Sequence, residues 1–444
     1  MSLSGQPTLF GELRKTLVLA APITAGHLSQ MILGLTDTLM IGRVGMVALA
    51  AAAFAHTIVH LVFVIGIGLL SAVSVLVAHA HGAGKPEEAG EMLRRGLFLG
   101  IVSGLLMFGL LRASFPLLVY LGQPPEVITE ARFYLFLTAG SLPFIMGTIA
   151  FKNYSEGQDR PWPAFWAGLT GVLLNIFLNW VFIYGNLGAP RLELDGAGWA
   201  TLASRIFTVA LLVAWLRLDR RFVASWPRQW LAAIPWSGLI SMIKLGFPVG
   251  LQIFMEVSAF AGTTLLMGWL GVVQIAAHQI ALTCAATTFM IPMGISLAVA
   301  IRVGHVLGAG QPERARNIGF GALGFVLLIM GSFALIFIFL NHGIAALFTH
   351  EEETIAMAAA LLVIAGFFQL FDGAQVIAIG ALRGAKDVTF PTWIIFGAYW
   401  VLALPVGSLL AFQTDLGARG LWIGLALGLG TAAVGLNMRF ARAT

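Results

Sequence analysis

Long runs of apolar residues, separated by short polar connectors, make up most of the chain. Twelve of these runs reach the roughly 20 residues that an α-helix needs to cross the hydrocarbon core of a bilayer. They lie at approximately 13–41, 49–79, 95–120, 127–151, 162–185, 196–217, 238–269, 273–305, 316–341, 353–382, 390–412 and 418–440. The pattern predicts an all-α polytopic membrane protein with twelve transmembrane helices.

Two segments of the first half recur in the second half at an offset of 226 residues. HGAGKPEEAGEMLRRG at 81–96 matches LGAGQPERARNIGFG at 307–321, and MIGRVGMVALAA at 40–51 matches LMGWLGVVQIAA at 266–277. The repeat predicts two pseudo-symmetric six-helix bundles, each entering the membrane in the same direction, with a cavity between them. We expect an N-terminal lobe at 1–217, a connector at 218–237 and a C-terminal lobe at 238–444.

The overall composition excludes a soluble protein. Hydrophobic residues make up 59% of the chain and charged residues only 10%, whereas soluble domains carry about 25% charged residues. The net charge of +5 comes from Lys and Arg in the connectors, and no basic, aromatic-interleaved domain suggests a nucleic-acid partner. The apolar run after Lys15 continues past Pro22 without a small-residue cleavage pattern, so we expect the first span to be retained rather than removed as a signal peptide.

The Lys and Arg residues are distributed unevenly between the two sides of the predicted membrane. The N-terminus, the connectors after even-numbered spans and the C-terminus hold most of the 25 Lys and Arg. The opposite side would hold Arg43, Arg112, Arg132, Arg191 and Arg419. Because cytoplasmic loops are enriched in positive charge, both termini are predicted to be cytoplasmic.

Asp37, Glu256 and Asp372 are acidic residues that fall inside predicted spans. Ionisable groups at membrane depth cost about 2.5 to 3.5 kcal/mol on insertion scales and commonly handle ions or substrates. Each shares a helical face with polar neighbours. These neighbours are His27, Gln30 and Gly34 for Asp37, Gln252 and Thr263 for Glu256, and Gln369 and Gln375 for Asp372. The alternative is a carboxylate that bonds a neighbouring helix and only fixes packing.

Glu256 and Asp372 both belong to the second half, so one site could contain both. Two carboxylates with Gln and Thr oxygens can coordinate Na⁺, and a buried carboxyl pair can also carry a proton. The sequence does not choose between Na⁺ and H⁺. No other metal is expected, because His56 and His60 stand at i, i+4 without a third ligand nearby.

Further polar residues of the spans are candidates for lining the cavity. Asn175 and Asn179 stand at i, i+4 on the fifth span and would be costly in contact with lipid, so we expect them to face Asp37. Simple interhelical hydrogen bonding is the alternative. The complete set of candidate lining residues is Asn175, Asn179, Gln279, Gln30, Gln252, Gln375 and Phe368. We interpret His278 as a hydrogen-bonded interior group.

Four segments carry a resemblance to a known family. They are TDTLMIGRVG with LAA soon after (36–51), NIFLNWVFIYG (175–185), the segment from MEVSAF to IRVGHVLGAG (255–310) and FDGAQVIAIGALRGAKD (371–387). Together they resemble the multidrug and toxic compound extrusion (MATE) family, and within it the NorM-type bacterial branch. The resemblance extends over nearly the whole chain.

The resemblance implies an antiporter that exports amphipathic, usually cationic drugs across the bacterial inner membrane in exchange for Na⁺ or H⁺. It implies no cofactor beyond the coupling ion and no obligate protein partner. In the family pattern, Asp37 matches the acid of the N-terminal lobe, and Glu256 and Asp372 match a cation-binding pair. Asn175 and Asn179 match polar positions of the N-terminal lobe. The aromatic residues just before Asp372 are Phe367, Phe368 and Phe371, with no tyrosine among them, which departs from relatives that use a hydroxyl contact there.

Two other functional classes predict different features. An intramembrane enzyme would need paired catalytic groups or a metal or diphosphate motif, whereas the three acids here lie on three separate spans. A lipid-linked precursor flippase of the same broader superfamily would handle a pyrophosphate, so its cavity should be basic. The acids within the spans therefore favour the antiporter.

Overall fold

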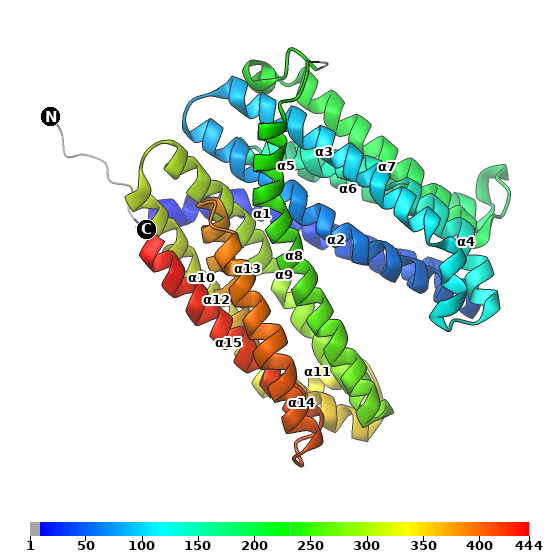
Figure 1. Ribbon diagram of the computed structural model, residues 1–444. Coiled ribbons are helices and arrows are strands. Elements are labelled where there is room, and N and C mark those ends of the chain that lie inside the picture. The colour runs from blue at the N-terminus through cyan, green and yellow to red at the C-terminus, as the bar shows by residue number, and fades with distance from the viewer. Residues whose placement is uncertain (1–8, 231, 444) are drawn as a thin grey trace. The chain divides into compact units, whose positions relative to one another are not determined.

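A computed structural model describes residues 9–230 and 232–443 (Figure 1). Over these residues, all regular elements are helices, and twelve stretches are long and apolar enough to cross a membrane. The predicted fold class is confirmed. The spans of the first half are α1 (Leu9–Gly42), α2 (Met46–Gly82), α3 (Pro86–Ala113), α4 with α5 (Pro125–Gly140 and Leu142–Gly157), α6 (Trp162–Tyr184) and α7 (Glu193–Leu218).

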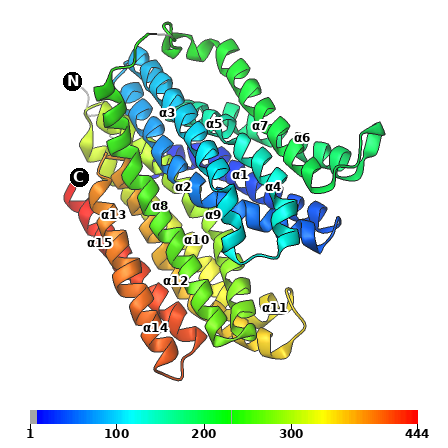
Figure 2. The ribbon, with the colours of Figure 1, turned by 45° about the vertical axis from the view of Figure 1, so that its right-hand side comes forward.

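The second half repeats this plan. Its spans are α8 (Trp236–Leu270), α9 (Val272–Gly308), α10 (Pro312–Phe339), α12 (Glu352–Gly384), a composite of α13 (Thr389–Phe396), η4 (Gly397–Ala403) and α14 (Leu404–Phe412), and α15 (Ala418–Ala443). Figure 2 shows α13 and α14 following one another along one line, so this composite is a single span. The short elements of the connectors are η1 (Phe115–Leu121), η2 (Asn186–Gly188), η3 (Arg220–Ser225) and α11 (Asn341–Ala346).

The third span shows how helix ends depart from the ends of the apolar runs. We expected it at 95–120, but α3 starts at Pro86 and ends at Ala113. Pro86 at the first helical position and two glutamates in the first turn stabilise a helix start, although none of them is apolar. Pro116 has no backbone N–H to donate to the carbonyl of Arg112, so the α-helical hydrogen-bond ladder stops and the chain continues as η1. Hydropathy therefore locates the membrane core and misses the polar first turns.

The internal repeat is visible in the backbone. Gly84 and Gly310 end α2 and α9, stand 226 residues apart, and have φ angles of +70° and +71°. Asp159 and Lys386 follow α5 and α12 and have φ angles of +62° and +61°, although neither is glycine. Left-handed backbone is uncommon for a residue with a side chain, so its recurrence at matched positions supports the repeat.

A matched pair of helix crossings also follows the repeat. A Cβ added at Gly157 would lie 2.9 Å from the carbonyl oxygen of Ser74, and one at Gly384 would lie 2.5 Å from that of Ala300. α5 therefore packs closely on α2, as α12 does on α9. Small residues at such crossings let helices approach within a membrane, where apolar side chains gain nothing by leaving lipid.

The chain forms two compact units, and each is described here by itself. One contains Ala25–Gly250, and the other combines residues 9–24 with 251–443. We expected the change between lobes in the connector at 218–237. Those bounds stay a prediction. The two contact units change over inside α1 and inside α8, because the first part of each helix packs on the bundle of the other half of the chain.

Specific contacts fix these helix starts. In the second unit, the Glu12 carboxylate of α1 pairs with the guanidinium groups of Arg302 in α9 and Arg314 in α10. In the first unit, a Cβ at Gly246 of α8 would lie 2.1 Å from the carbonyl oxygen of Leu69 in α2. The salt bridge therefore holds the start of α1 in one unit, and the close glycine contact holds the start of α8 in the other.

Candidate cation and substrate site

Glu256, Gln375 and Tyr399 form a hydrogen-bonded cluster in the unit that contains most of the second half. The Tyr399 hydroxyl donates to Glu256 Oε1 at 3.2 Å, and Gln375 Nε2 lies 3.4 Å from the same oxygen. Gln375 Nε2 and the Tyr399 hydroxyl are 3.2 Å apart. The three residues come from α8, α12 and η4, so the Glu256 carboxylate is held from three separate elements.

Asp372 adds a second carboxylate to this cluster. It lies one turn before Gln375 on the same face of α12, is only 8% exposed and interacts electrostatically with Glu256 and Tyr399. It makes no hydrogen bond to another residue in the described part of the chain. Two carboxylates in a dry bundle repel each other, and a bound cation or a proton relieves that repulsion.

Tyr399 was not predicted from the sequence. It lies in a π-helical segment of the eleventh span, Gly397–Ala403, and π-helical turns often occur at functional sites. No tyrosine stands among the aromatic residues before Asp372, and the hydroxyl is supplied by Tyr399 from a different helix. A signal existed in the sequence, because a tyrosine inside an apolar span requires a hydrogen-bond partner for its hydroxyl.

Phe368 belongs to an aromatic group behind the acids. Its ring centroid lies 6.1 Å from that of Phe260 and 5.4 Å from that of Trp422, and Phe260 lies 6.1 Å from Tyr399. Phe368 is only 2% exposed. In this structure it shapes the wall of the acid cluster and offers little surface of its own to a ligand.

His278 is linked to the same aromatic group. Trp422 Nε1 donates to His278 Nδ1 at 3.2 Å, and the Thr264 hydroxyl lies 2.9 Å from His278 Nε2. Both ring nitrogens therefore have partners. This arrangement agrees with an interior, hydrogen-bonded histidine.

The remaining glutamines of this unit differ in their placement. The Thr288 hydroxyl donates to Gln369 Oε1 at 3.0 Å, while Gln369 Nε2 is buried and has no partner among the described residues. Gln252 is buried one turn before Glu256. Gln279 is exposed and forms no side-chain hydrogen bond within the described part of the chain. Gln252 therefore lies one helical turn before Glu256, and Gln369 lies one turn before Asp372.

Asp37, Asn179, Asn175 and Ser204 form a chain of hydrogen bonds in the other unit. Asn179 Nδ2 donates to Asp37 Oδ1 at 2.6 Å and to Asn175 Oδ1 at 2.9 Å. Asn175 Nδ2 continues to the Ser204 hydroxyl at 3.3 Å. The structure therefore brings the two asparagines of α6 to the acid of α1. Asn179 Oδ1 is buried and unpartnered among the described residues, so one strong acceptor next to Asp37 is unused.

Other polar groups around Asp37 were not predicted. Arg205 of α7 interacts electrostatically with Asp37 and donates to the hydroxyl of Ser141, in the break between α4 and α5. The Tyr134 hydroxyl lies 2.9 Å from His56 Nε2, so His56 has a phenol for a partner. Gln30 is exposed and does not join this network in the described structure.

The three predicted acids thus fall into two clusters, one in each unit, while Gln30 and Gln279 lie outside both. Asp37 belongs to one, and Glu256 with Asp372 to the other. Within the described residues, no group of three or more His, Cys, Asp or Glu side chains comes together. The second cluster offers carboxylate, amide and phenol oxygens, which suit a weakly held monovalent cation or a proton.

Known proteins resemble the chain along almost its whole length. The family description MatE matches residues 22–181 and 248–409, one match in each half. A protein of Rhodopseudomonas palustris named probable multidrug resistance protein NorM is 40% identical over 439 residues, covering 98% of this chain and 92% of the relative. A protein of the same name from Pseudomonas syringae is 36% identical, covering 98% and 96%.

Solved structures share the fold. The eukaryotic MATE transporter AtDTX14 superposes with a TM-score of 0.86 at 23% identity, covering 97% of this chain and 96% of that one. A mutant of the Vibrio cholerae MATE transporter VcmN gives a TM-score of 0.90 at 21% identity, covering 99% and 98%. At these identities the likeness concerns the fold.

Proposed function

Because the chain belongs to the MatE (multidrug and toxic compound extrusion) family, we propose that it is a secondary active multidrug efflux antiporter. It exports amphipathic, mostly cationic compounds in exchange for Na⁺ or H⁺ by alternating access. Like its relatives, the protein is a transporter and not an enzyme. It is a multi-pass membrane protein. We place it in the bacterial inner membrane with both termini in the cytoplasm, which the distribution of Lys and Arg supports.

The observation that carries the proposal is the pairing of Glu256 with Asp372 inside an apolar bundle. Burying one unpaired carboxylate costs free energy, and burying two that repel each other costs more. A site with this composition is stable with a cation or a proton bound to it. Exchange of that cation for another is the chemistry on which antiport depends.

The partners of Glu256 suit either coupling ion. Na⁺ prefers oxygen ligands, and the cluster supplies carboxylate, phenol and amide oxygens from Glu256, Asp372, Tyr399 and Gln375. A flip of the Gln375 side-chain amide can direct either its oxygen or its nitrogen toward Glu256, since the two groups have nearly the same shape. With H⁺ as the coupling ion, one carboxyl would carry the proton and the other would accept a hydrogen bond from it.

A lipophilic cation is the substrate class that fits the same acids. An organic cation satisfies a buried carboxylate and can contact aromatic rings at the same time, whereas an anion would meet repulsion. Substrate and coupling ion would then weaken each other's binding by the same factor, because the coupling between two sites is reciprocal. This mutual weakening lets an inward ion gradient release the drug outside.

The test is to reconstitute the full chain into liposomes and follow efflux of an ethidium-like dye under a Na⁺ gradient or a pH gradient. We expect one of the gradients to drive efflux in the native protein, and neither to do so in Glu256→Gln or Asp372→Asn. Glu353→Gln, an exposed acid in the first turn of the same helix as Asp372, is the matched control and should transport normally. Gradient-driven efflux in both acid variants would refute the proposal.

A further inference from the structure

The connector between α7 and α8 folds against the start of α3, and the two segments line an open cavity of about 320 Å³. Its polar lining consists of Glu87, Glu91 and Arg94 from α3 and of Arg228 and Gln229 from the connector, beside the ring of Trp226. All of these residues belong to one unit. The cavity has no part in the acid clusters described above, and its volume suits a small polar group.

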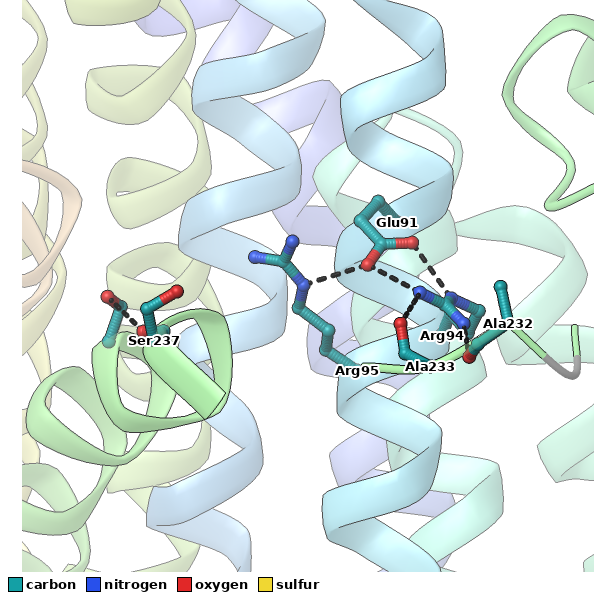
Figure 3. Close-up of polar contacts among 7 residues, drawn as sticks. Glu91, Arg94, Arg95, Ala232, Ala233 and Ser237 are labelled. Atoms are coloured by element: carbon teal, nitrogen blue, oxygen red, sulfur yellow. Dashed lines mark hydrogen bonds and ion pairs between the residues drawn. The ribbon is translucent and has the colours of Figure 1, made fainter. Parts of the chain in front are cut away.

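Arg94 fixes one wall of this cavity. Its Nε and Nη2 donate to the two oxygens of Glu91 at 2.8 and 2.9 Å, and its Nη1 and Nη2 donate to the carbonyl oxygens of Ala232 and Ala233 (Figure 3). Arg95 Nε also donates to Glu91, at 3.0 Å. The Arg94 side chain is only 8% exposed. It joins the end of the connector to α3 through four of its five N–H donors.

The opposite wall is equally well held. The Tyr154 hydroxyl donates to the carbonyl oxygen of Ser225 at 2.9 Å. A Cβ at Gly90 would lie 2.4 Å from that same oxygen, so the connector backbone rests directly on α3. Trp226 stacks on Phe151 of α5, with ring centroids 6.3 Å apart and planes at 15°. The contacts of Arg94, Ser225 and Trp226 therefore hold the connector against α3 and α5.

Two opposite charges of the lining are left without partners. Glu91 is neutralised by Arg94 and Arg95. Glu87 and Arg228 are exposed and form no ion pair within the described part of the chain, although both line the cavity. A ligand that carries one positive and one negative group would satisfy both.

The cavity lies where such a ligand is abundant. It sits at the first turns of α3 and on the connector that joins α7 to α8, so it lies near the ends of three candidate membrane spans. The ring of Trp230 packs against that of the lining residue Trp226, with centroids 5.6 Å apart, and is 39% exposed. Tryptophan is enriched at the level of lipid head groups. The groups available at that depth are the phosphate and the terminal group of a phospholipid.

We propose that this cavity binds the phosphoethanolamine head group of a membrane lipid, with the ammonium at Glu87 and the phosphate at Arg228. The ammonium of ethanolamine donates hydrogen bonds to a carboxylate, which the quaternary nitrogen of choline lacks the N–H groups to do. An anionic glycerol head group would satisfy Arg228 but leave Glu87 without a cation. Binding at this site is independent of the proposed antiport.

The test uses the purified full chain, stripped of lipid in detergent, and native mass spectrometry with added phosphatidylethanolamine, phosphatidylcholine or phosphatidylglycerol. We expect phosphatidylethanolamine to bind most tightly, and Glu87→Gln and Arg228→Gln each to weaken it by about 10-fold. Glu88→Gln and Arg220→Gln are matched controls. Glu88 is the next residue of the same helix turn and pairs with Lys85 at 2.7 Å, and neither control residue lines the cavity.

Several outcomes would overturn the proposal. One is equal affinity for the ethanolamine and choline lipids, and another is an effect of Glu87→Gln no larger than that of Glu88→Gln. Free phosphoethanolamine serves as a further arm. If the soluble head group competes with the lipid at equal concentration, the ligand is a soluble zwitterion and the lipid assignment is wrong. Because Glu87 and Arg228 are exposed, their substitution should not disturb folding, which thermal unfolding of each variant checks.

Discussion

The Tyr399 hydroxyl donates a hydrogen bond to the Glu256 carboxylate at 3.2 Å, although the two residues stand 143 positions apart in the sequence. This contact joins the π-helical segment of the eleventh span to α8 and fixes the orientation of the acid. Because Gln375 approaches the same oxygen from α12, the carboxylate is positioned before any cation binds. Preorganised ligands lose less entropy on binding than mobile ones.

The first prediction concerns that hydroxyl. Tyr399→Phe removes a hydrogen bond to a charged group, which is worth about 1.5 to 3 kcal/mol. Ion-driven dye efflux from proteoliposomes should therefore fall by about 10-fold or more at subsaturating gradients. The amount of folded protein should not change. Tyr120→Phe is the control, since Tyr120 is 84% exposed. Equal efflux rates in the two variants would show that the hydroxyl does not position Glu256.

The second prediction concerns the hydrogen bond that Asn179 Nδ2 donates to Asp37 Oδ1 at 2.6 Å. Asn179→Leu removes the hydrogen-bond donor of the Asp37 carboxylate, so it should lower the free energy of unfolding. In an Asp37→Asn background, the same substitution should lower the free energy of unfolding by less. The coupling energy from the double-mutant cycle should be about 1 to 2 kcal/mol, measured by SDS-induced unfolding. Additive effects would mean that the contact contributes nothing to stability.

The third prediction concerns the start of α1. Glu12→Gln removes the carboxylate that pairs with both Arg302 and Arg314. Breaking a buried pair in this way costs about 3 kcal/mol. The variant should unfold at a lower temperature, and protease should cut α1 more readily. Glu313→Gln, an exposed acid on α10, should behave like the native protein. Unchanged proteolysis of Glu12→Gln would mean that packing alone holds α1.

The fourth prediction concerns orientation. On a Cys284→Ala background, Lys85→Cys, Arg228→Cys and Lys386→Cys should react with thiol reagents only from the cytoplasm, because the positive connectors face that side. Arg191→Cys, on a connector of the opposite side, should react only from outside. Labelling of Lys386→Cys from outside would contradict the twelve-span orientation.

The number of spans and their approximate positions could be predicted because the bilayer sets the length of an apolar helix. The acids could be predicted as well, since Asp37, Glu256 and Asp372 are conspicuous in apolar surroundings. Helix spacing also identified Asn179 and Gln375, which the structure places beside Asp37 and Glu256.

Other features could not be read from the sequence. Tyr399 reaches Glu256 because a π-helical segment sets its direction, and no hydropathy pattern records that change of pitch. The division of the chain into units falls inside α1 and α8, where the helix continues and the composition does not shift. Arg205 and Ser141 meet through the packing of α7 on the break between α4 and α5. Each of these depends on tertiary packing between distant segments.

The central claim is that a cation and a drug draw on the same buried acids. The most direct test is to titrate an ethidium-like dye into the purified protein, with and without Na⁺ and at two pH values. The account predicts that either Na⁺ or a lower pH raises the apparent Kd of the dye, and that Asp372→Asn abolishes this dependence. A dye affinity that neither ion alters, together with equal binding of an anionic dye of similar size, would contradict it.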